Sequence, residues 1–90
     1  MRYTYDPKKR VGNLNKHGYD FDDSALVIES GHSITFEDRR FDEGEQRFIT
    51  LGVLRGDVVV IATAETDEET RVISMRRAER NEEEIYYRNV

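Results

Sequence analysis

Cysteine is absent from this sequence of 90 residues. Without a thiol the chain cannot form disulfides, use a cysteine nucleophile or build a zinc–thiolate site. Long apolar runs are absent too: the longest, Val58–Ala62, is far shorter than the roughly 20 residues that cross a membrane. The first residues also lack the apolar run of a signal peptide. These absences predict a cytoplasmic protein with no membrane segment.

Proline and glycine are scarce, with one proline and six glycines, and no repeat, low-complexity stretch or linker interrupts the chain. Chains divide into several domains only beyond roughly 250 residues, so we expect residues 1–90 to form a single domain. The hydrophobic fraction of 37% is enough for a modest core. The charged fraction is also 37%, above the usual level of about 25%, so we expect many charges on the surface or in an interface.

The net charge of −5 is unlike that of most nucleic-acid binders, whose affinity comes largely from neutralising phosphates. The charge is unevenly distributed, however. Residues 1–17 carry five lysines and arginines against one acid, whereas residues 20–46 carry nine acids against two arginines. The sequence therefore allows a basic patch on an acidic body.

A first helix is predicted to begin at Asp6-Pro7 and to end at Gly18. Asp6 can accept hydrogen bonds from the free N–H groups of the first turn, and proline fits that turn. Glycine takes the left-handed conformation that ends many helices. Val11 and Leu14 lie three residues apart and are expected to share one face.

A second helix is predicted from Asp20 to Gly31, with Asp20 as its cap and Asp23 completing an acidic variant of the capping box. Its apolar face is expected at positions i, i+4 and i+7, with Leu26 beside it. These positions are Phe21, Ala25 and Ile28.

Strands are predicted where polar and apolar residues alternate or where β-branched residues dominate. The segments are 3–5, 33–37, 46–54, 58–63 and 71–76. Arg55-Gly56-Asp57 is expected to form a hairpin turn, residues 38–44 and 65–70 polar loops, and residues 78–88 a final helix. Residues 58–63 are β-branched on both faces, which indicates a central strand. The order β-α-α-β-β-β-β-α predicts an α+β fold with a small antiparallel sheet.

Lys16-His17-Gly18 is the first candidate for chemistry, because the charge of a histidine changes near neutral pH. His17 could act as a general acid or base, or it could simply stabilise the C-terminus of the first helix. His32 is expected to be an ordinary loop residue. Two isolated histidines without acids at ligand spacing do not predict a metal site, and no glycine-rich phosphate loop or serine-nucleophile motif predicts a cofactor or a hydrolase of that kind.

Arg76 is the second candidate, because it shares a strand face with Ser74 at the end of the last strand. The planar guanidinium group suits a phosphate or an oxyanion. The alternative is an ion pair with the final helix, for example with Glu79. Arg47 could reach the same surface as Arg76, or it could be a charge that protects an edge strand.

Glu82 and Tyr86 lie four residues apart and therefore share one face of the final helix. Glu82 could orient Arg76, act as a base, or make an ordinary surface pair. The acids of this helix form either a solvated face or a docking surface for a basic partner. They are Glu79, Glu82, Glu83 and Glu84.

Several motifs in order resemble the BrnT family of bacterial ribonuclease toxins. The resemblance covers nearly the whole chain, from about Tyr5 to Tyr86. The matching pieces are Tyr5-Asp6-Pro7-x-Lys9, Asn13-x-x-Lys16-His17-Gly18, Phe21-Asp22-Asp23-x-Ala25, Gly44-Glu45-x-Arg47 with Gly52, and Ile73-Ser74-x-Arg76-x-Ala78-x-x-x-Glu82-x-x-x-Tyr86.

The resemblance implies a RelE-like ribonuclease fold and the toxin half of a type II toxin–antitoxin system. It implies metal-independent cleavage of RNA that inhibits translation, and neutralisation by a BrnA-like ribbon-helix-helix antitoxin, with a heterotetramer as one form of the complex. Carried onto this chain, the resemblance implies that Arg47 and Arg76 hold the phosphate and that His17 or Glu82 moves protons. RNA contacts would come from Lys9, Lys16 and Tyr86.

One stretch departs from the family pattern. After the central strand the family usually has an aromatic residue or histidine, then threonine, a variable residue and arginine, whereas this chain reads Ala62-Thr63-Ala64-Glu65. A glutamate that faced the phosphate would repel the substrate. Two hypotheses therefore follow: an endoribonuclease, or a catalytically weakened or inactive binding module that acts through its protein partner.

Overall fold

The computed structural model describes residues 2–40 and 44–90. The described elements are β1 (Arg2–Thr4), α1 (Pro7–His17), the 3-10 helix η1 (Phe21–Asp23), α2 (Ser24–Ile28), β2 (Ile34–Glu37), β3 (Gln46–Leu54), β4 (Asp57–Glu65), β5 (Glu69–Arg77) and α3 (Arg80–Asn89). The α+β class and the predicted order of elements are confirmed. Residues 41–43 of the predicted polar loop lie outside the described residues. No described helix is long and apolar enough to cross a membrane.

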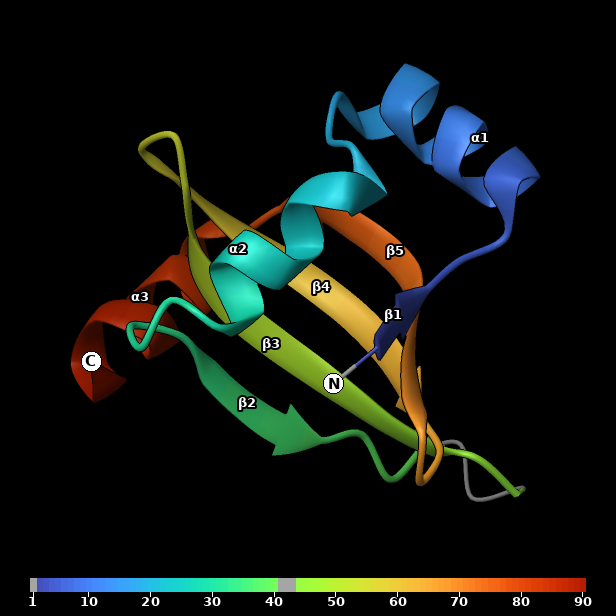
Figure 1. Ribbon diagram of the computed structural model, residues 1–90. Coiled ribbons are helices and arrows are strands. Elements are labelled where there is room, and N and C mark those ends of the chain that lie inside the picture. The colour runs from blue at the N-terminus through green and yellow to red at the C-terminus, as the bar shows by residue number, and fades with distance from the viewer. Residues whose placement is uncertain (1, 41–43) are drawn as a thin grey trace.

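The five strands form one sheet in the order β1-β5-β4-β3-β2, so the predicted central strand β4 does lie in the middle (Figure 1). Strands β2 to β5 follow one another as antiparallel neighbours, as expected from sequential hairpins. β1, which overlaps the predicted strand at 3–5, lies at the edge of the sheet, but it runs parallel to β5, so the sheet is mixed. A parallel pair needs a long crossover, and the helical segment and further strands between β1 and β5 provide it.

The β3–β4 hairpin closes through a two-residue turn at Arg55-Gly56. Leu54 pairs with Asp57, and the φ angles of the two turn residues are 48° and 87°. Two successive positive φ angles define the type I′ turn, whose twist matches that of the flanking strands. The hairpin turn predicted from the sequence is therefore confirmed.

Both predicted ends of α1 are confirmed. Asp6 Oδ1 accepts a hydrogen bond of 2.9 Å from the backbone N–H of Lys8. Gly18 has φ 78° and donates its N–H to the carbonyl of Leu14 at 2.9 Å. Val11 and Leu14, however, face away from the sheet, with 55% and 41% of their surfaces exposed.

Asn13 is the residue through which α1 docks on the sheet. Its Nδ2 donates to the carbonyl of Met75 at 2.8 Å, and its Oδ1 accepts from the N–H of Met75 at 3.1 Å. β1 pairs with β5 only at residues 69–71, so the edge of β5 near Met75 has no strand beside it. Because a buried edge needs hydrogen-bond partners, the amide of Asn13 takes the place that an apolar side chain would have on an ordinary helix face.

The second helix differs from its prediction in its first turn and its length. Asp20 caps it as expected by accepting from the N–H of Asp22 at 3.0 Å, but the first turn is the 3-10 helix η1, and α2 ends at Ile28 rather than at Gly31. With three residues per turn, the buried positions become i, i+3 and i+6. Phe21 is buried and Ile28 packs against the core as predicted, but Ser24 and Val27 are the other buried residues, and Leu26 is exposed, so the predicted face was only partly right.

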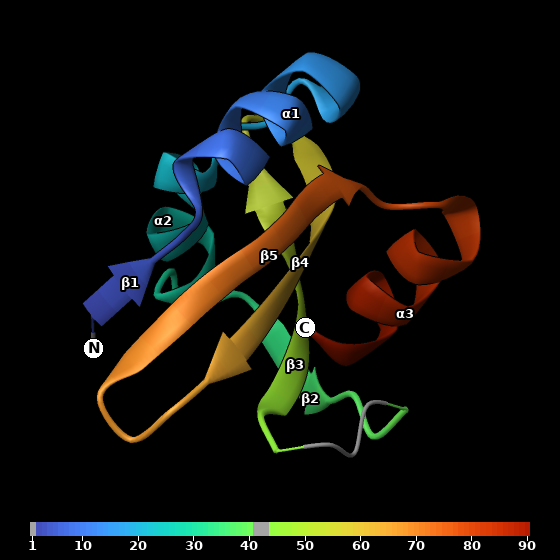
Figure 2. The ribbon, with the colours of Figure 1, turned by 90° about the vertical axis from the view of Figure 1, so that its right-hand side faces the viewer.

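The sheet has a core on each face. Figure 2 shows α1 and α2 on one side of the sheet and α3 on the other. The core under α1 and α2 consists of Phe21, Val27, Leu54, Val59, Ile61, Val72 and Met75. The core under α3 consists of Leu51, Val58, Val60, Ala78 and Tyr86. We call these two faces the α2 face and the α3 face.

A bulge in β5 decides which of its side chains reach each face. Ala62 pairs with Ser74 and Thr63 pairs with Val72, so Ile73 is the extra residue. The bulge brings Val72 and Met75 into the same core, which strict alternation would place on opposite faces. Strict alternation would also place Val72 beside Ser74 and Arg76, but the bulge turns it to the α2 face. Ser74 and Arg76 share the α3 face, as predicted.

Candidate active site

Three arginines line one pocket of about 280 Å³ on the α3 face: Arg40, Arg47 and Arg76. Asp38 is the one carboxylate among its described lining residues. Its wall includes the apolar side chains of Ile49, Val60, Ala62 and Ile73 and the hydroxyl of Ser74. We call it the arginine pocket. Because its cations outnumber its carboxylate, the arginine pocket suits an anionic group next to an apolar surface.

Arg76 reaches this pocket from β5, and Glu82 at the start of α3 holds it. Nη1 and Nη2 of Arg76 each donate to one carboxylate oxygen of Glu82 at 2.8 Å, which is a bidentate pair. The expected pairing of Arg76 with Glu82 is thus present, and Glu79 is not the partner. Glu82 Oε1 also accepts from the N–H of Glu79 at 2.8 Å and closes the capping box of α3.

The same contacts fix the charges of both residues. The hydrogen bonds from Arg76 lower the pKa of Glu82 against an opposing effect of burial, and the N–H of Glu79 lowers it further. The hydrogen bond to Glu82 raises the pKa of Arg76. Glu82 therefore remains ionised at neutral pH, and a carboxylate with a lowered pKa is a poor general base.

Arg40 and Asp38 reach the arginine pocket from the segment after β2. Asp38 accepts from Nε and Nη2 of Arg40 at 2.9 and 2.8 Å, and these bonds lower the pKa of the Asp38 carboxyl. The backbone N–H of Asp38 donates to the carbonyl of Arg47 at 2.8 Å, which extends the β2–β3 ladder and places Asp38 beside the pocket. Sequence reasoning missed both residues because a polar loop carries no periodicity. The paired basic residues Arg39-Arg40 within an acidic stretch were the one signal.

Arg47 lies on an interior strand rather than on an edge. β3 pairs with β2 on one side and with β4 on the other, and Arg47 is opposite Ala64. The alternative that Arg47 is a charge protecting an edge strand was therefore wrong. Its side chain lies on the α3 face with those of Ser74 and Arg76, as the shared lining of the arginine pocket shows.

Lys9, Lys16 and His17 lie exposed on α1 and are not among the described residues that line the arginine pocket. α1 nevertheless lies close to this end of the sheet, because α1 and α3 flank the end of β5 on opposite sides (Figure 2).

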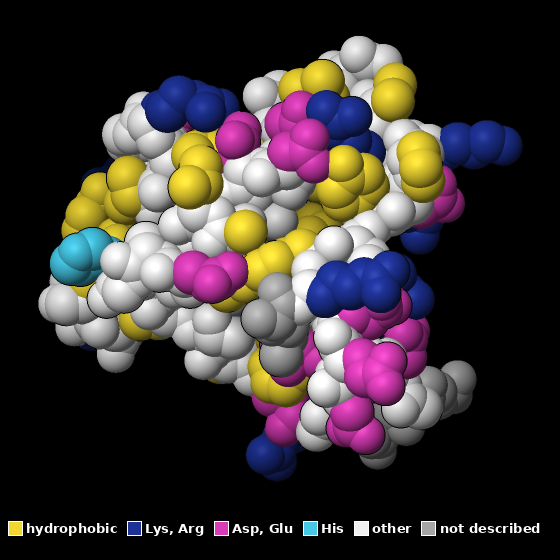
Figure 3. Space-filling view, viewed as in Figure 1, with side chains coloured by type: hydrophobic (Ala, Val, Ile, Leu, Met, Phe, Trp, Pro, Cys, Tyr) yellow, Lys and Arg dark blue, Asp and Glu magenta, His cyan; other side chains and the backbone are white. Residues whose placement is uncertain are grey.

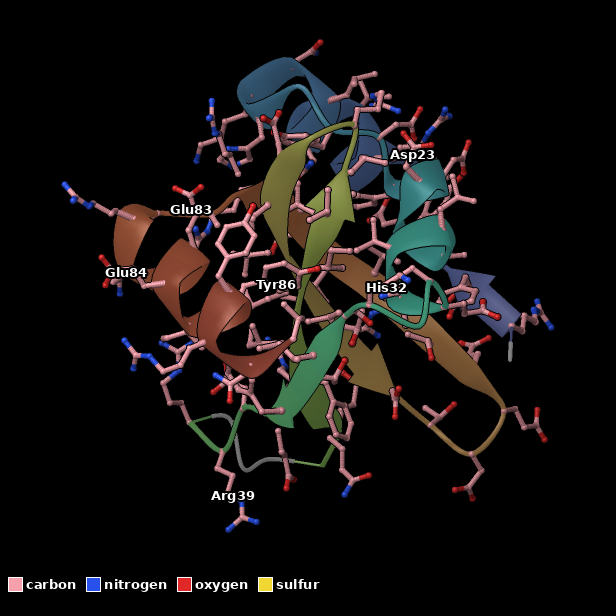
Figure 4. The ribbon with its side chains drawn as sticks, turned by 90° about the vertical axis from the view of Figure 1, so that its left-hand side faces the viewer. Asp23, His32, Arg39, Glu83, Glu84 and Tyr86 are labelled. Carbon is pink, nitrogen blue, oxygen red and sulfur yellow. The ribbon has the colours of Figure 1, made fainter. Side chains whose placement is uncertain are left out.

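Tyr86 is buried, with 4% of its surface exposed, in the core between α3 and the sheet. Its hydroxyl donates to the carbonyl of His32 at 2.7 Å. Figure 4 shows Tyr86 directed inward from α3 with the His32 loop beside it, while Glu83 and Glu84 point outward. In this arrangement Tyr86 anchors α3, and the ring is not available for stacking on a base.

Glu65 lies on the opposite face of the sheet from the arginine pocket. It pairs with Gln46 and Thr70, and its Oε1 lies 3.5 Å from the hydroxyl of Thr70 on the α2 face. The expected repulsion of a phosphate by Glu65 is therefore not directed at this pocket. That expectation assumed that all residues at the end of the central strand share one face, but strand neighbours alternate.

Comparison with known proteins gives one family. A family model described as the ribonuclease toxin BrnT of type II toxin–antitoxin systems matches residues 5–82, which is most of the chain. The search of curated proteins gives no match. Within residues 2–40 and 44–90, no group of three or more histidines, cysteines, aspartates or glutamates is placed to hold a metal ion.

Proposed function

The chain belongs to the BrnT family of ribonuclease toxins from type II toxin–antitoxin systems, and from this premise we propose that the arginine pocket is its RNA-cleaving site. One observation carries the proposal. Arg47 and Arg76 converge with Arg40 on one pocket, and Glu82 holds Arg76 in a fixed orientation. Oriented cations in a partly buried site are what a reaction that develops charge on a phosphate requires.

In the proposed reaction the ribose 2′-hydroxyl attacks the adjacent phosphorus. The bond from the 2′-oxygen to phosphorus forms, and the bond from phosphorus to the 5′-oxygen of the next nucleotide breaks. A base takes the proton of the 2′-hydroxyl, and an acid protonates the leaving 5′-oxygen. The products are a 2′,3′-cyclic phosphate and a free 5′-hydroxyl, so no water, metal or cofactor enters this step.

Arg47 and Arg76 bind the non-bridging phosphate oxygens in this proposal, and Ser74 adds a hydroxyl donor from the same face. The guanidinium fork of Arg47 matches two phosphate oxygens, whereas Arg76, whose Nη1 and Nη2 each donate to Glu82, contributes its charge and its remaining N–H donors. In the phosphorane the negative charge on these oxygens increases, so both arginines bind the transition state more tightly than the ground state.

Glu82 is a positioning residue in this proposal, because its lowered pKa and its two bonds to Arg76 oppose its use as a base. His17 is then the candidate for proton transfer among the residues predicted from the sequence. Lys9 and Lys16 bind phosphates that flank the cleaved bond, along α1. Tyr86 supports the site through its packing.

We further propose that the protein acts on RNA in the cytoplasm, inhibits translation, and is neutralised by a BrnA-like ribbon-helix-helix antitoxin. The family supports an antitoxin partner. The alternative of an inactive binding module rested mainly on Glu65, which lies on the other face of the sheet, so we do not advance it.

Incubation of the purified chain with an RNA transcript in excess EDTA tests this proposal. We expect cleavage that leaves 2′,3′-cyclic phosphate and 5′-hydroxyl ends. Arg76→Ala should lower the rate at least a hundredfold, because it removes a cation from the transition state. Arg77→Ala is the matched control, since Arg77 is its exposed neighbour on the other face. Cleavage that requires a metal, or that Arg76→Ala leaves unchanged, would overturn the proposal.

A further inference from the structure

The arginine pocket has one carboxylate among its described lining residues, Asp38, to which the proposed reaction assigns no role. Only 8% of the Asp38 side chain is exposed, although it lies directly after the edge strand β2. Burial of a carboxylate is unfavourable unless cations and hydrogen-bond donors replace the lost water. Arg40 provides both. Its Nε and Nη2 donate to Asp38 at 2.9 and 2.8 Å, and its backbone N–H donates to Asp38 Oδ1 at 3.2 Å.

Asp38 also interacts with a second arginine of the pocket. Its backbone N–H donates to the carbonyl of Arg47 at 2.8 Å, which fixes the segment after β2 against β3. The hydrogen bonds from Arg40 are the main cause of the lowered pKa of the Asp38 carboxyl, and the charge of Arg47 adds to it. Asp38 therefore stays ionised near neutral pH and offsets the repulsion between two cations of the same pocket.

The pair of Asp38 and Arg40 matters more for the orientation of Arg40 than for stability. The Arg40 side chain is 77% exposed, and an ion pair with so exposed a partner contributes little to folding. An exposed arginine normally loses much rotamer freedom when a ligand orders it. Two hydrogen bonds to one carboxylate order the guanidinium group in advance, which favours binding.

The same arrangement occurs on the other side of the pocket, where Glu82 holds Arg76. Arg76 belongs to β5, whereas Arg40 follows β2, and β3 and β4 lie between these strands. Neighbouring strands are about 5 Å apart, so the ladder places β2 and β5 roughly 14 Å apart. Arg40 and Arg76 therefore approach the pocket from opposite sides, with Arg47 of β3 between their strands.

The charge of the other face makes the α3 face the expected side for a chain of phosphates. Figure 3 looks onto the α2 face, where acidic side chains gather around the β4–β5 turn. This turn includes Asp67 and Glu68. Because like charges repel, an extended polyanion is disfavoured there and favoured beside the three arginines.

We propose that Arg40, positioned by Asp38, binds the phosphate next to the cleaved one. The preferred substrate is then an RNA strand that places two successive phosphates across the pocket, rather than a single phosphodiester. The apolar wall of the pocket, which includes Ile49 and Val60, contacts the nucleoside that joins these phosphates. This inference rests on the proposed function, because it concerns the same pocket.

NMR titrations with a dinucleoside monophosphate and a trinucleoside diphosphate of 2′-O-methyl RNA test the role of Arg40. Neither compound can be cleaved, because the attacking hydroxyl is blocked. We expect the wild-type protein to bind the compound with two phosphates about tenfold more tightly, through one charge-assisted contact. Arg40→Ala should reduce this gain to about twofold, the advantage that two binding registers give by themselves.

Arg39→Ala is the matched control for Arg40→Ala. The Arg39 side chain is 86% exposed, pairs with Glu37 and is not among the described residues that line the arginine pocket. Figure 4 shows it directed away from the protein. Its loss removes the same charge at the neighbouring position and should leave the gain unchanged. A wild-type protein that gains nothing from the second phosphate, or an equal loss in both variants, would overturn the inference.

Asp38→Asn tests the positioning role, because charge and position predict opposite signs. Removal of a negative charge beside the pocket should by itself strengthen the binding of phosphates. If the carboxylate orients Arg40, the amide, which offers one acceptor oxygen in place of two, should instead weaken binding of the trinucleoside diphosphate about threefold. In the Arg40→Ala background the same change should no longer weaken binding.

Glu37→Gln is the control for this sign, since it removes a charge next to Asp38 but outside the described lining of the arginine pocket. It should not weaken binding. Preserved amide spectra will show that each variant is folded. Tighter binding by Asp38→Asn, or the same weakening with and without Arg40, would contradict the positioning role.

Failure of this inference is distinguishable from failure of the ribonuclease proposal, because the titrations need no cleavage. Transcript cleavage that depends on Arg76, together with an unchanged gain in Arg40→Ala, would retain the proposed function and reject the inference. The expected binding by a protein that does not cleave RNA would reject the proposed function and retain the second phosphate contact.

Discussion

Replacement of Glu82 by glutamine tests whether this residue positions Arg76 or acts as a base. The amide keeps the size of the side chain, but it removes the negative charge and one of the two acceptors for Arg76. Its remaining oxygen can still accept from the N–H of Glu79, so the start of α3 is retained. The change therefore acts mainly on the guanidinium group.

The expected magnitudes separate the two roles. The side chains of Arg76 and Glu82 are 37% and 22% exposed, so water screens the pair and its loss should cost about 1 kcal/mol of stability. In a domain of this size that lowers Tm by roughly 4–8 °C. A less ordered Arg76 should slow cleavage about tenfold. Loss of a general base would instead slow cleavage about 10²- to 10⁴-fold.

Single-turnover cleavage of a labelled transcript between pH 5 and 9 measures the effect. We expect a uniform loss of about tenfold with an unchanged pH profile. Glu83→Gln serves as the control, because Glu83 neighbours Glu82 on α3 and points outward (Figure 4). A loss beyond a hundredfold together with disappearance of the acidic limb of the profile would refute the positioning role, and so would an unchanged rate.

Three further predictions concern the scaffold. Gly52→Ala should lower the free energy of unfolding by about 2 kcal/mol in urea denaturation, because the new Cβ would overlap Val27 Cγ1. Gly12→Ala is the control, because a Cβ at this position of α1 meets no other atom and should not destabilise the protein. Asn13→Ala should lower the free energy of unfolding by about 2 kcal/mol, because it leaves the N–H and the carbonyl of Met75 without the side-chain partners that Asn13 provides. Asn15 is exposed, so Asn15→Ala should leave the free energy of unfolding nearly unchanged in the same assay. The hydrogen bond from Arg10 lowers the pKa of Asp20 to about 2. The ionised Asp20 therefore stabilises the folded protein fully above pH ~4, and this contribution is lost as the pH falls toward 2. Asp20→Asn should flatten the wild-type loss of stability across that window, and an equally steep acid transition in both proteins would contradict the assignment.

Local signals in the sequence predicted the elements well where one residue type dictates one backbone conformation. Asp6 and Gly18 cap α1 as expected, and Arg55-Gly56 forms the hairpin turn. The β-branched run at 58–63 lies in the central strand, because only a strand buried on both faces has that composition.

The burial of side chains was harder to predict, because it depends on contacts between distant segments. Val11 and Leu14 share a face of α1, but the docking of Asn13 on β5 turns that face outward. The 3-10 turn at Phe21 changes the spacing of buried residues from 3.6 to 3, which composition does not reveal.

The sequence predicted only those residues of the candidate site that local patterns reveal. Arg47, Arg76 and Glu82 were found from strand faces and helix spacing, which are local patterns. Asp38 and Arg40 were missed, because only the pairing of Asp38 with Arg47 across the sheet brings them to the pocket. Glu65 was expected beside the phosphate, because the order of motifs along the chain does not show on which face of a strand a side chain lies.

Induction of the chain alone in a bacterial host, without an antitoxin, tests the central claim that the arginine pocket cleaves RNA. We expect growth arrest and RNA fragments with 5′-hydroxyl ends. Arg76→Ala should abolish both at equal soluble expression, whereas Arg77→Ala on the other face should retain both. Unchanged growth with well-expressed wild-type protein, or equal arrest by Arg76→Ala, would contradict the account.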